Sequence, residues 1–166
     1  MGAARIGLCA ISTGWLWDKV RVAGGACGTT VMFDSQTGVA SFLLFRDPHV
    51  LRALDVYAQS GAWLRRVAYS ERSRSGVIGA VAALDRPLPP EALALDLLQR
   101  HLVGLTDDLR QAELEAVLSA ELRDLVDLSH ALDAAIPIGP VAVLGLETAL
   151  RAALEQRPGS FLFVEA

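Results

Sequence analysis

The residues best suited to chemistry lie in the glycine-rich stretch Ala23–Thr30, which holds one of the two cysteines of the chain, Cys27. A thiol becomes a nucleophile when its thiolate is stabilised, and glycines allow a backbone to approach an anion closely. Cys27 is therefore the candidate catalytic residue. The candidate ligand-binding residues are Gly25, Cys27, Gly28 and Thr29. The alternative is a flexible turn that leads into a strand, with a thiol that packs as a small apolar side chain.

No other group of residues points to an enzyme. The glycines lack the lysine and the following helix of a P-loop, and the chain has neither a Ser-His-Asp ordering nor a dinucleotide-binding fingerprint. Its two cysteines and three histidines are scattered, without the spacing of metal ligands. We therefore expect no metal and no cofactor, and a protein that is not an enzyme is favoured over one that is.

Composition indicates a folded, intracellular chain. The 166 residues are enough for one domain with its own core, and two cysteines do not make a disulfide framework, which favours a reducing, cytoplasmic location. The longest apolar runs, Val39–Phe45 and Val77–Leu84, have the length of a strand and not of a membrane span. With 52% hydrophobic residues and a mean hydropathy of +0.38, the chain has apolar surface to spare for a partner.

Charge is divided unevenly along the chain. Residues 1–90 carry ten Lys and Arg against six Asp and Glu, whereas residues 91–166 carry five against thirteen. The formal net charge is −4, and an acidic chain is a poor general binder of nucleic acid. We expect no nucleic acid and no membrane among its partners.

The first half of the chain predicts a sheet. Thr29–Phe33 and Val39–Phe45 flank a turn and read as a hairpin, and Asp47-Pro48 opens a helix that ends at Gly61. Residues 62–69 and 76–84 read as a second hairpin, with further strands near residues 6–11 and 160–165. The expected fold class is α+β, an antiparallel sheet of about five strands, two hairpins around a helix, with helices on one face and a helical C-terminal half.

The second half predicts three helices. The first follows Pro87–Pro90 and runs to Leu105, the second spans about 107–135 behind the capping residue Thr106, and the third covers about 141–156. We expect one domain over residues 1–166, made of a sheet core (1–105), a helical extension (106–157) and a short terminal strand (160–165). A leucine stripe on the second helix is the candidate interface. Its members are Leu114, Leu118, Leu122, Leu125 and Leu132.

One segment resembles GAF domains, a family of sensory domains related to PAS and profilin-like folds. It consists of the Gly-Val-rich run Ser75–Leu84, the helix start Pro87–Glu91 and the leucine-rich helix through Leu105. The resemblance implies a signalling domain that senses small molecules. Only about 30 residues separate the first hairpin from Gly76, which is fewer than a GAF ligand pocket usually takes, so the pocket is expected to be reduced.

Three functions follow from these patterns. The first is a non-enzymatic regulatory or scaffolding domain that acts through protein–protein association, as a homodimer or with another protein, with a small-molecule ligand left open. The second is an accessory subunit of a larger assembly. The third is a small cysteine-dependent enzyme that uses Cys27. The sequence does not decide between self-association and a different partner.

Overall fold

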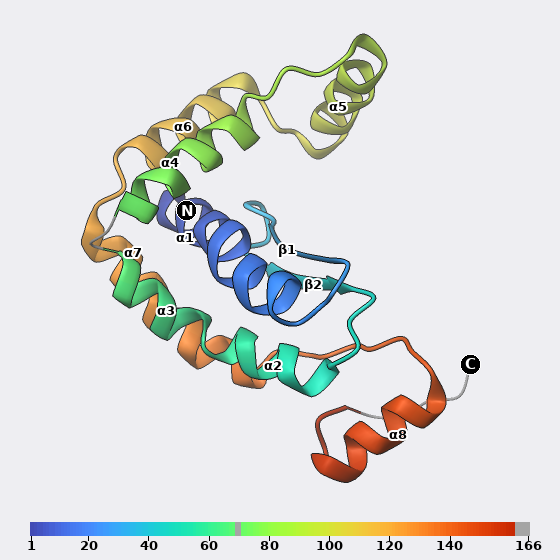
Figure 1. Ribbon diagram of the computed structural model, residues 1–166. Helices are drawn as coiled ribbons and strands as arrows, with labels where there is room; N and C mark the ends of the chain where they lie inside the picture. Colours follow the sequence, from blue (N-terminus) through green and yellow to red (C-terminus); the bar gives the residue numbers. More distant parts are fainter. Residues whose placement is uncertain (69–70, 162–166) are drawn as a thin grey trace.

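The computed structural model describes residues 1–68 and 71–161 and is predominantly helical. Two strands form one antiparallel hairpin, and the helices precede and follow it in the chain (Figure 1). The elements are α1 (Gly2–Ala10), the π-helix η1 (Ile11–Val22), β1 (Gly28–Phe33), β2 (Ala40–Phe45), α2 (Val50–Ala58), α3 (Ser60–Val67), α4 (Glu71–Leu84), α5 (Pro90–Val103), α6 (Asp107–Leu118), α7 (Leu122–Ala135), the short 3-10 helix η2 (Ile136–Ile138) and α8 (Glu147–Gln156).

Helix α1 lies at the centre of the helical layer. It packs against α4, α6 and α7, and η1 continues it towards the hairpin (Figure 1). Two glycines make the close approach possible, because a Cβ on Gly2 would collide with the backbone of Ala116 in α6 and a Cβ on Gly7 would collide with Leu128 in α7. A helix covered on several sides has to be apolar around most of its circumference, and Ile6, Gly7 and Leu8 are all buried.

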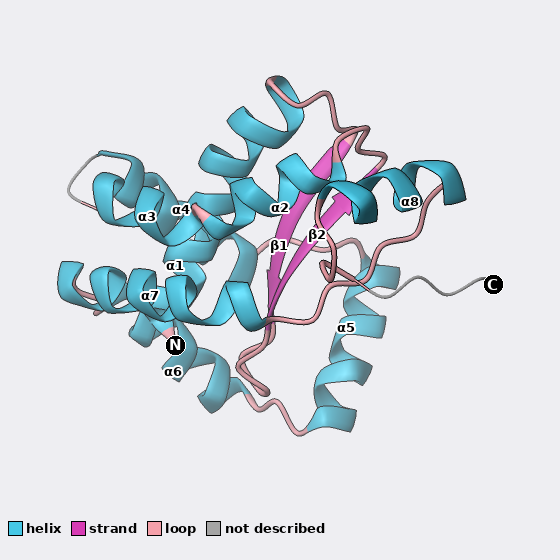
Figure 2. Ribbon diagram, turned by 90° about the horizontal axis from the view of Figure 1, so that it is seen from below, coloured by secondary structure: helices cyan, strands magenta, loops and turns pink. Residues whose placement is uncertain are grey.

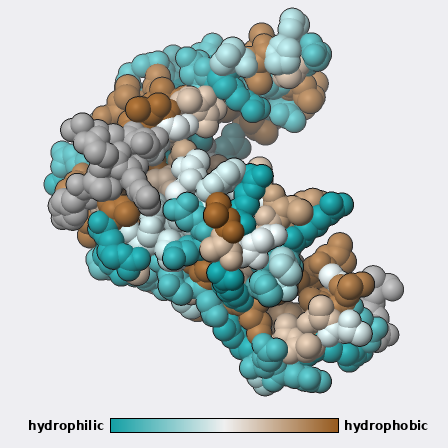
Figure 3. Space-filling model, in the orientation of Figure 1, coloured by the Kyte–Doolittle hydropathy of each residue, from teal (hydrophilic) through white to brown (hydrophobic). Residues whose placement is uncertain are grey.

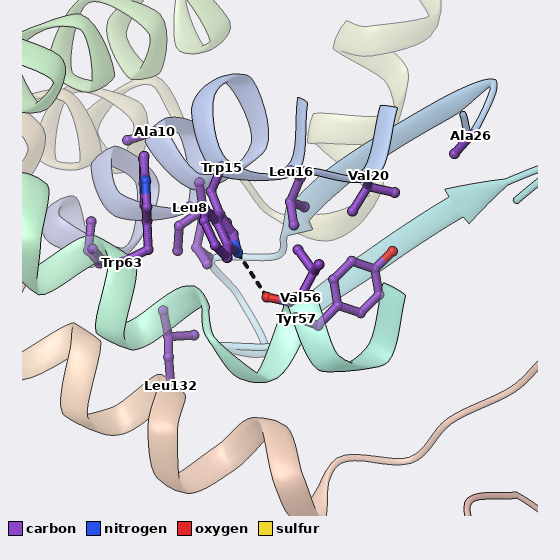
Figure 4. Packing of buried hydrophobic residues seen from close by; sticks show 12 residues of the cluster. Leu8, Ala10, Trp15, Leu16, Val20, Ala26, Val56, Tyr57, Trp63 and Leu132 are labelled. Atoms are coloured by element: carbon purple, nitrogen blue, oxygen red, sulfur yellow. Dashed lines mark hydrogen bonds between the residues drawn. The ribbon is translucent and has the colours of Figure 1, made fainter. Parts of the chain in front are cut away.

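The π-helix η1 carries the aromatic part of the core. Its wider turns are seen at its end, where the Ala23 N–H donates to the Asp18 carbonyl five residues back. Trp15 packs against Trp63 of α3 with ring centroids 6.1 Å apart, and its indole N–H bonds the Val56 carbonyl of α2 (Figure 4). The core between η1, α2 and α3 is therefore held by a directional hydrogen bond as well as by apolar contacts.

The predicted hairpin Thr29–Phe33 and Val39–Phe45 is confirmed as β1 and β2. Its inner face packs on the helices, with the Phe42 ring 5.0 Å from that of Tyr57 in α2. Its turn is held by Asp34, whose carboxylate accepts bonds from the Thr37 hydroxyl (2.7 Å) and the Gln36 N–H (2.9 Å). These bonds favour the ionised form, and together they lower the pKa of Asp34.

Helices α3 and α7 form a second close pair. A Cβ on Gly61 would collide with the Ser129 carbonyl and the Asp133 carboxylate of α7. Arg65 donates to Asp133 at 2.5 Å and to the Ser129 hydroxyl at 3.2 Å. The missing side chain at Gly61 brings the helices together, and the ion pair fixes their relative position.

Two helices extend away from this body, one at each end of the open, curved molecule. Figures 1 and 2 show α5 and α8 projecting on either side of the hairpin. Helix α5 begins at Pro90 and ends at Gly104, whose φ of 71° is the left-handed conformation that glycine adopts readily at a helix end. The predicted start is confirmed, the helix ends two residues before the predicted Leu105, and no residue along it is buried.

The expected sheet of about five strands is wrong, because the second predicted hairpin is helical. Residues 62–67 lie in α3, residues 76–84 lie in α4 and residues 6–11 lie in α1 and the start of η1. Short apolar runs are shared by buried strands and buried helices, and the sequence pattern does not separate them. In α4 the glycines allow close helix packing, since a Cβ on Gly79 would meet the Cys9 sulfur of α1 at 2.7 Å. The GAF-like strand Ser75–Leu84 is therefore a helix.

Two predicted boundaries also change. The helix expected over 107–135 starts as predicted, with the Thr106 hydroxyl accepting from the Leu109 N–H (3.3 Å), but it is divided into α6 and α7. The break follows from a second cap, since the Asp124 carboxylate accepts from the Glu121 N–H at 2.8 Å. The helix expected from 141 begins only at Glu147. The strand expected at 160–165 lies largely outside the described residues.

Candidate functional site

The glycine-rich turn connects the end of η1 to the start of β1, beside the end of β2. Gly25 has a φ of 80°, a left-handed conformation that requires glycine or strains another residue. Ala26 is buried and donates its N–H to the Val20 carbonyl (3.2 Å). Cys27 is exposed, and its N–H donates to the Arg46 carbonyl across the hairpin base (3.4 Å).

Of the four predicted ligand-binding residues, two are part of the hairpin ladder. Gly28 pairs with Phe45 and Thr29 with Leu44, and the Thr29 hydroxyl donates to the Leu43 carbonyl (3.3 Å). Gly25 and Cys27 lie on the exposed side of the turn. The structure thus brings the four residues together at one end of the hairpin, and their role as a binding site stays a prediction.

The two thiols differ in their surroundings. Cys27 is exposed, and in residues 1–68 and 71–161 no side chain hydrogen-bonds its sulfur. Cys9 is half-buried beside Gly79 of α4, and burial raises the pKa of its thiol. A raised pKa lowers the thiolate fraction at neutral pH, so Cys9 is less reactive than a free thiol.

A small recess opens next to the turn, between η1 and α2. It has a volume of about 10 Å³ and is lined by Lys19, Val20, Gly24, Asp47, His49, Arg52, Ala53 and Val56. Small-molecule pockets are usually about 300–1,000 Å³. The recess is at the lower limit for a single water, so it does not serve as a ligand pocket in this form.

Several cations around this end of the molecule are placed on aromatic rings. The Arg21 guanidinium lies 4.1 Å from the Trp17 ring centroid, and that of Arg46 lies 5.0 Å from Phe45. Arg46 also has a φ of 51°, which is uncommon for a residue with a side chain. Sequence reasoning missed Arg46, and no local signal besides the following Asp47-Pro48 marks it.

The predicted leucine interface is divided by the structure. Leu125 and Leu132 of α7 are buried against α1 and α3, whereas Leu118 at the end of α6 is 65% exposed. Leu114 is half-buried and Leu122 is exposed at the start of α7. The five residues therefore do not form one continuous free surface, and an interface that includes Leu114, Leu118 and Leu122 stays a prediction.

A larger exposed apolar surface lies on α5, where sequence reasoning did not place one. Six of its apolar side chains are each at least 41% exposed: Leu93, Leu95, Leu97, Leu98, Leu102 and Val103. A second exposed group lies between η2 and α8, at Ile138, Val141, Leu144 and Leu146. Figure 3 shows apolar surface at both ends of the molecule, with an open recess between α5 and the body. The signal was present in the sequence, because α5 is apolar on more than one side.

The remaining candidate ligands are dispersed. His49, His101 and His130 are all exposed and lie on different elements. Within the described ranges, no three His, Cys, Asp or Glu side chains are grouped so that they could hold a metal ion. None of the helices in those ranges is long and apolar enough to cross a bilayer.

Comparison with known proteins gives a consistent match. The family model described as PreP C-terminal domain matches residues 2–145. The chain is 37% identical over 152 residues to presequence protease 1, chloroplastic/mitochondrial, of Arabidopsis thaliana, covering 91% of this chain. It is 27% identical over 116 residues to the mitochondrial presequence protease of Danio rerio, covering 69% of this chain. It is also 25% identical over 138 residues to Protein HypA of Clostridium perfringens, covering 82% of this chain.

These relatives are much longer proteins. The chain spans 14% of the Arabidopsis relative, 11% of the Danio rerio relative and 14% of the Clostridium relative. The similarity therefore concerns one part of each relative, and the activity in their names belongs to the whole proteins.

The comparisons correct three expectations: the resemblance, the function and the location. The GAF-like resemblance is wrong, since the matching family is a peptidase-associated domain. The regulatory, signalling function inferred from it is wrong for the same reason. The comparisons point to a peptidase-associated domain in place of a small Cys27-dependent enzyme, and the alternative of an accessory subunit stays a prediction. The cytoplasmic location is overturned by the relatives named as mitochondrial or chloroplastic. The resemblance failed because a short Gly-Val-rich run and a capped helix occur in many families.

Proposed function

The chain belongs to the PreP C-terminal domain family, and on this premise we propose that it serves as the C-terminal domain of a presequence protease. In this role it packs against the other parts of the protease and holds them in the arrangement that cleaves presequence peptides. The similarity to the Arabidopsis relative supports the proposal, because it extends over 91% of this chain.

The single observation that carries the packing role is the exposure of α5. A helix with leucines on more than one side and no buried residue is not stable as a free arm in water. Natural monomers rarely expose such a patch, and those that do use it as an interaction surface. In a protein about seven times as long as this chain, the other parts provide the surface that covers α5.

The polar side of α5 fits the same role. Asp96 and Arg100 form an ion pair of 2.5 Å one helical turn apart, on the half-buried side of the helix, so the leucines occupy its exposed sides. The exposed group at Ile138–Leu146 lies at the other end of the molecule (Figure 1). Two separate apolar surfaces support the proposal that the rest of the protease contacts the domain at both ends.

A chimeric protease tests the proposal. The matching segment of the Arabidopsis relative is replaced with residues 1–166, and cleavage of a presequence peptide is compared with that of the native enzyme and of a version without the segment. We expect the chimera to be soluble and to cleave the peptide, and the deleted version to be inactive. A soluble, folded chimera without cleavage contradicts the proposal.

Matched variants show whether α5 is the contact. Leu97→Glu with Leu98→Glu places two charges on the exposed apolar side, and we expect at least a tenfold loss of cleavage in the chimera. The control is Gln99→Glu with His101→Glu, which adds two charges to exposed positions of the same helix. Equal effects of the two pairs exclude the leucine surface as the contact.

A further inference from the structure

The hairpin is a sheet with only one of its faces covered. Its inner face packs on η1 and α2 through the half-buried side chains of both strands, including Val31, Phe42 and Leu44. On its outer face Met32 is 60%, Leu43 is 43% and Phe45 is 61% exposed. A two-stranded hairpin is marginally stable by itself, and sheets of three or more strands are the usual stable form.

The outer edge of β2 has free backbone groups. Val31 donates its N–H to the Ser12 hydroxyl (3.3 Å), so this N–H points away from β2. In an antiparallel ladder, the partner of such a residue also points its N–H and C=O away. That partner is Phe42, and by the same alternation Ala40 and Leu44 face outward too. In the described part of the chain, no hydrogen bond outside the hairpin reaches the backbone of these three residues.

This edge lacks the features that protect a free edge. Natural edge strands often carry a charged residue such as Lys, or a proline, and either one prevents pairing with a further strand. The six residues of β2 (Ala40–Phe45) contain no charged residue and no proline, and neither do the six of β1. The guanidinium of Arg5 donates a hydrogen bond to Ser35, which lies in the turn and not in β2. This contact therefore places no charge on the edge of β2.

From these observations we propose that the outer edge of β2 binds an extended segment from the remaining part of the protease, which adds a third antiparallel or parallel strand to the hairpin. The inference rests on the proposed function, because that function places about six sevenths of the relative's length outside this chain. The segment spans about six residues, the length of β2, and a helix or neighbouring strand that follows it covers Met32, Leu43 and Phe45.

A permanent strand fits better than a substrate peptide in transit. A substrate leaves after each turnover and exposes the edge again, and an uncharged apolar edge that is repeatedly exposed promotes aggregation. A strand of the same protease stays in place and removes the edge. The backbone bonds supply the affinity, and the alternate apolar side chains fix the register.

Hydrogen exchange of individual amides tests the proposal. In the free chain we expect the outward amides of Phe42 and Leu44 to exchange rapidly, and the ladder amides of Ser41 and Leu43 to be protected. In the chimeric protease described above, we expect the Phe42 and Leu44 amides to slow at least 100-fold, without peptide present. Ser41 and Leu43 serve as internal controls, since the hairpin protects them in both proteins.

A pair of matched variants adds a functional readout. Leu43→Lys puts a charge on the outer face of β2, and we expect it to reduce the protection of the Phe42 and Leu44 amides and the cleavage rate by at least tenfold. Val39→Lys adds the same charge at an exposed position just before β2, and we expect little change. Circular dichroism of both free variants checks that they are folded.

The possible failures are distinguishable. If the chimera is active, with α5 protected but Phe42 and Leu44 still exchanging rapidly, the strand addition is wrong and the proposed function stands. If protection of these two amides appears only when a presequence peptide is added, the occupant is substrate and the proposal of a permanent strand is overturned. If the chimera is inactive and neither α5 nor β2 gains protection, both proposals fail.

Discussion

The indole N–H of Trp15 donates a hydrogen bond of 2.8 Å to the carbonyl oxygen of Val56, and so joins η1 to α2 inside the core. The carbonyl belongs to the helix, and the indole reaches it from the neighbouring element (Figure 4). A buried bond of this kind fixes the rotation of one helix against another, which apolar contacts alone leave less defined.

Removing this donor should destabilise the protein. Trp15→Phe keeps an aromatic ring but deletes the N–H and leaves a small void, and we expect a loss of about 1–3 kcal/mol in the free energy of unfolding. Urea denaturation measures it. Trp17→Phe is the control, because Trp17 is exposed, and its effect should stay below about 0.5 kcal/mol. Equal losses for the two variants contradict a structural role of the hydrogen bond.

Because α3 and α7 are in close contact at Gly61, we expect a single added methyl group at this position to destabilise the protein. Gly61→Ala places a Cβ against the Ser129 carbonyl and the Asp133 carboxylate, and we expect a loss of about 1–3 kcal/mol through overpacking, although Ala favours helix. The control is Gly145→Ala, whose Cβ would make an ordinary contact of 3.6 Å with Leu150. If thermal unfolding shows the two variants to be equally stable, the helices are not as close as described.

A double-mutant cycle should detect the ion pair between α1 and α6. Arg5 donates to Glu113 at 2.7 Å, with the two side chains 21% and 17% exposed. We expect Arg5→Met and Glu113→Gln to show a coupling free energy of about 1–2 kcal/mol, above the usual value for surface pairs. The largely exposed pair Arg123–Glu121 is the control, and its coupling should be near zero. A coupling near zero for both pairs would refute the prediction.

The turn of the hairpin should depend on pH through Asp34. Its hydrogen bonds from Thr37 and Gln36 lower its pKa in the folded state, so its contribution to stability is present above the ordinary pKa of Asp and is lost as pH falls through the lowered value. NMR titration of the carboxyl carbon measures this pKa directly. Thr37→Val should move it towards the ordinary value, whereas Gln36→Ala keeps the backbone N–H and should leave it unchanged.

Alkylation should distinguish the two thiols. We expect iodoacetamide to modify Cys27, which is exposed, at least tenfold faster than Cys9 at about pH 8, because burial both shields Cys9 and raises its pKa. In the Cys27→Ser variant, the rate of alkylation of Cys9 should increase with pH, and the increase should occur at a higher pH than for a free thiol. In denaturant the two cysteines should react alike. Faster reaction of Cys9 in the folded protein is inconsistent with its burial beside α4.

The sequence predicts the elements that carry their own local signals. The hairpin has a turn cluster at Asp34–Gly38, and that turn is held by the Asp34 side chain as such sequences allow. Thr106 precedes α6 as a cap. In each case the donor and the acceptor that fix the boundary lie within a few residues of each other in the sequence. Such a local interaction can be predicted from the sequence without knowledge of the rest of the fold.

The elements that were predicted wrongly depend on distant partners. Residues 76–84 form a helix because Gly76 and Gly79 fit against Ile6 and Cys9 of α1, about 70 residues earlier in the chain. The candidate site shows the same limit. The sequence brought Gly25–Thr29 together as neighbours, but the place of Arg46 beside Cys27 follows from the pairing of β1 with β2. The leucines of α5 can be read from the sequence. That no described element of the fold covers them becomes apparent only in the structure.

The central position of α1 sets the order in which the chain can fold. This helix precedes α4, α6 and α7 in the chain, yet it is covered by all three, and its ion pair joins residues separated by 108 positions. Such non-local contacts slow folding, so on the ribosome α1 stays uncovered until α7, which ends at Ala135, has emerged. A nascent chain arrested before that point presents a bare apolar helix, and chaperones that recognise exposed hydrophobic segments should bind it until translation resumes.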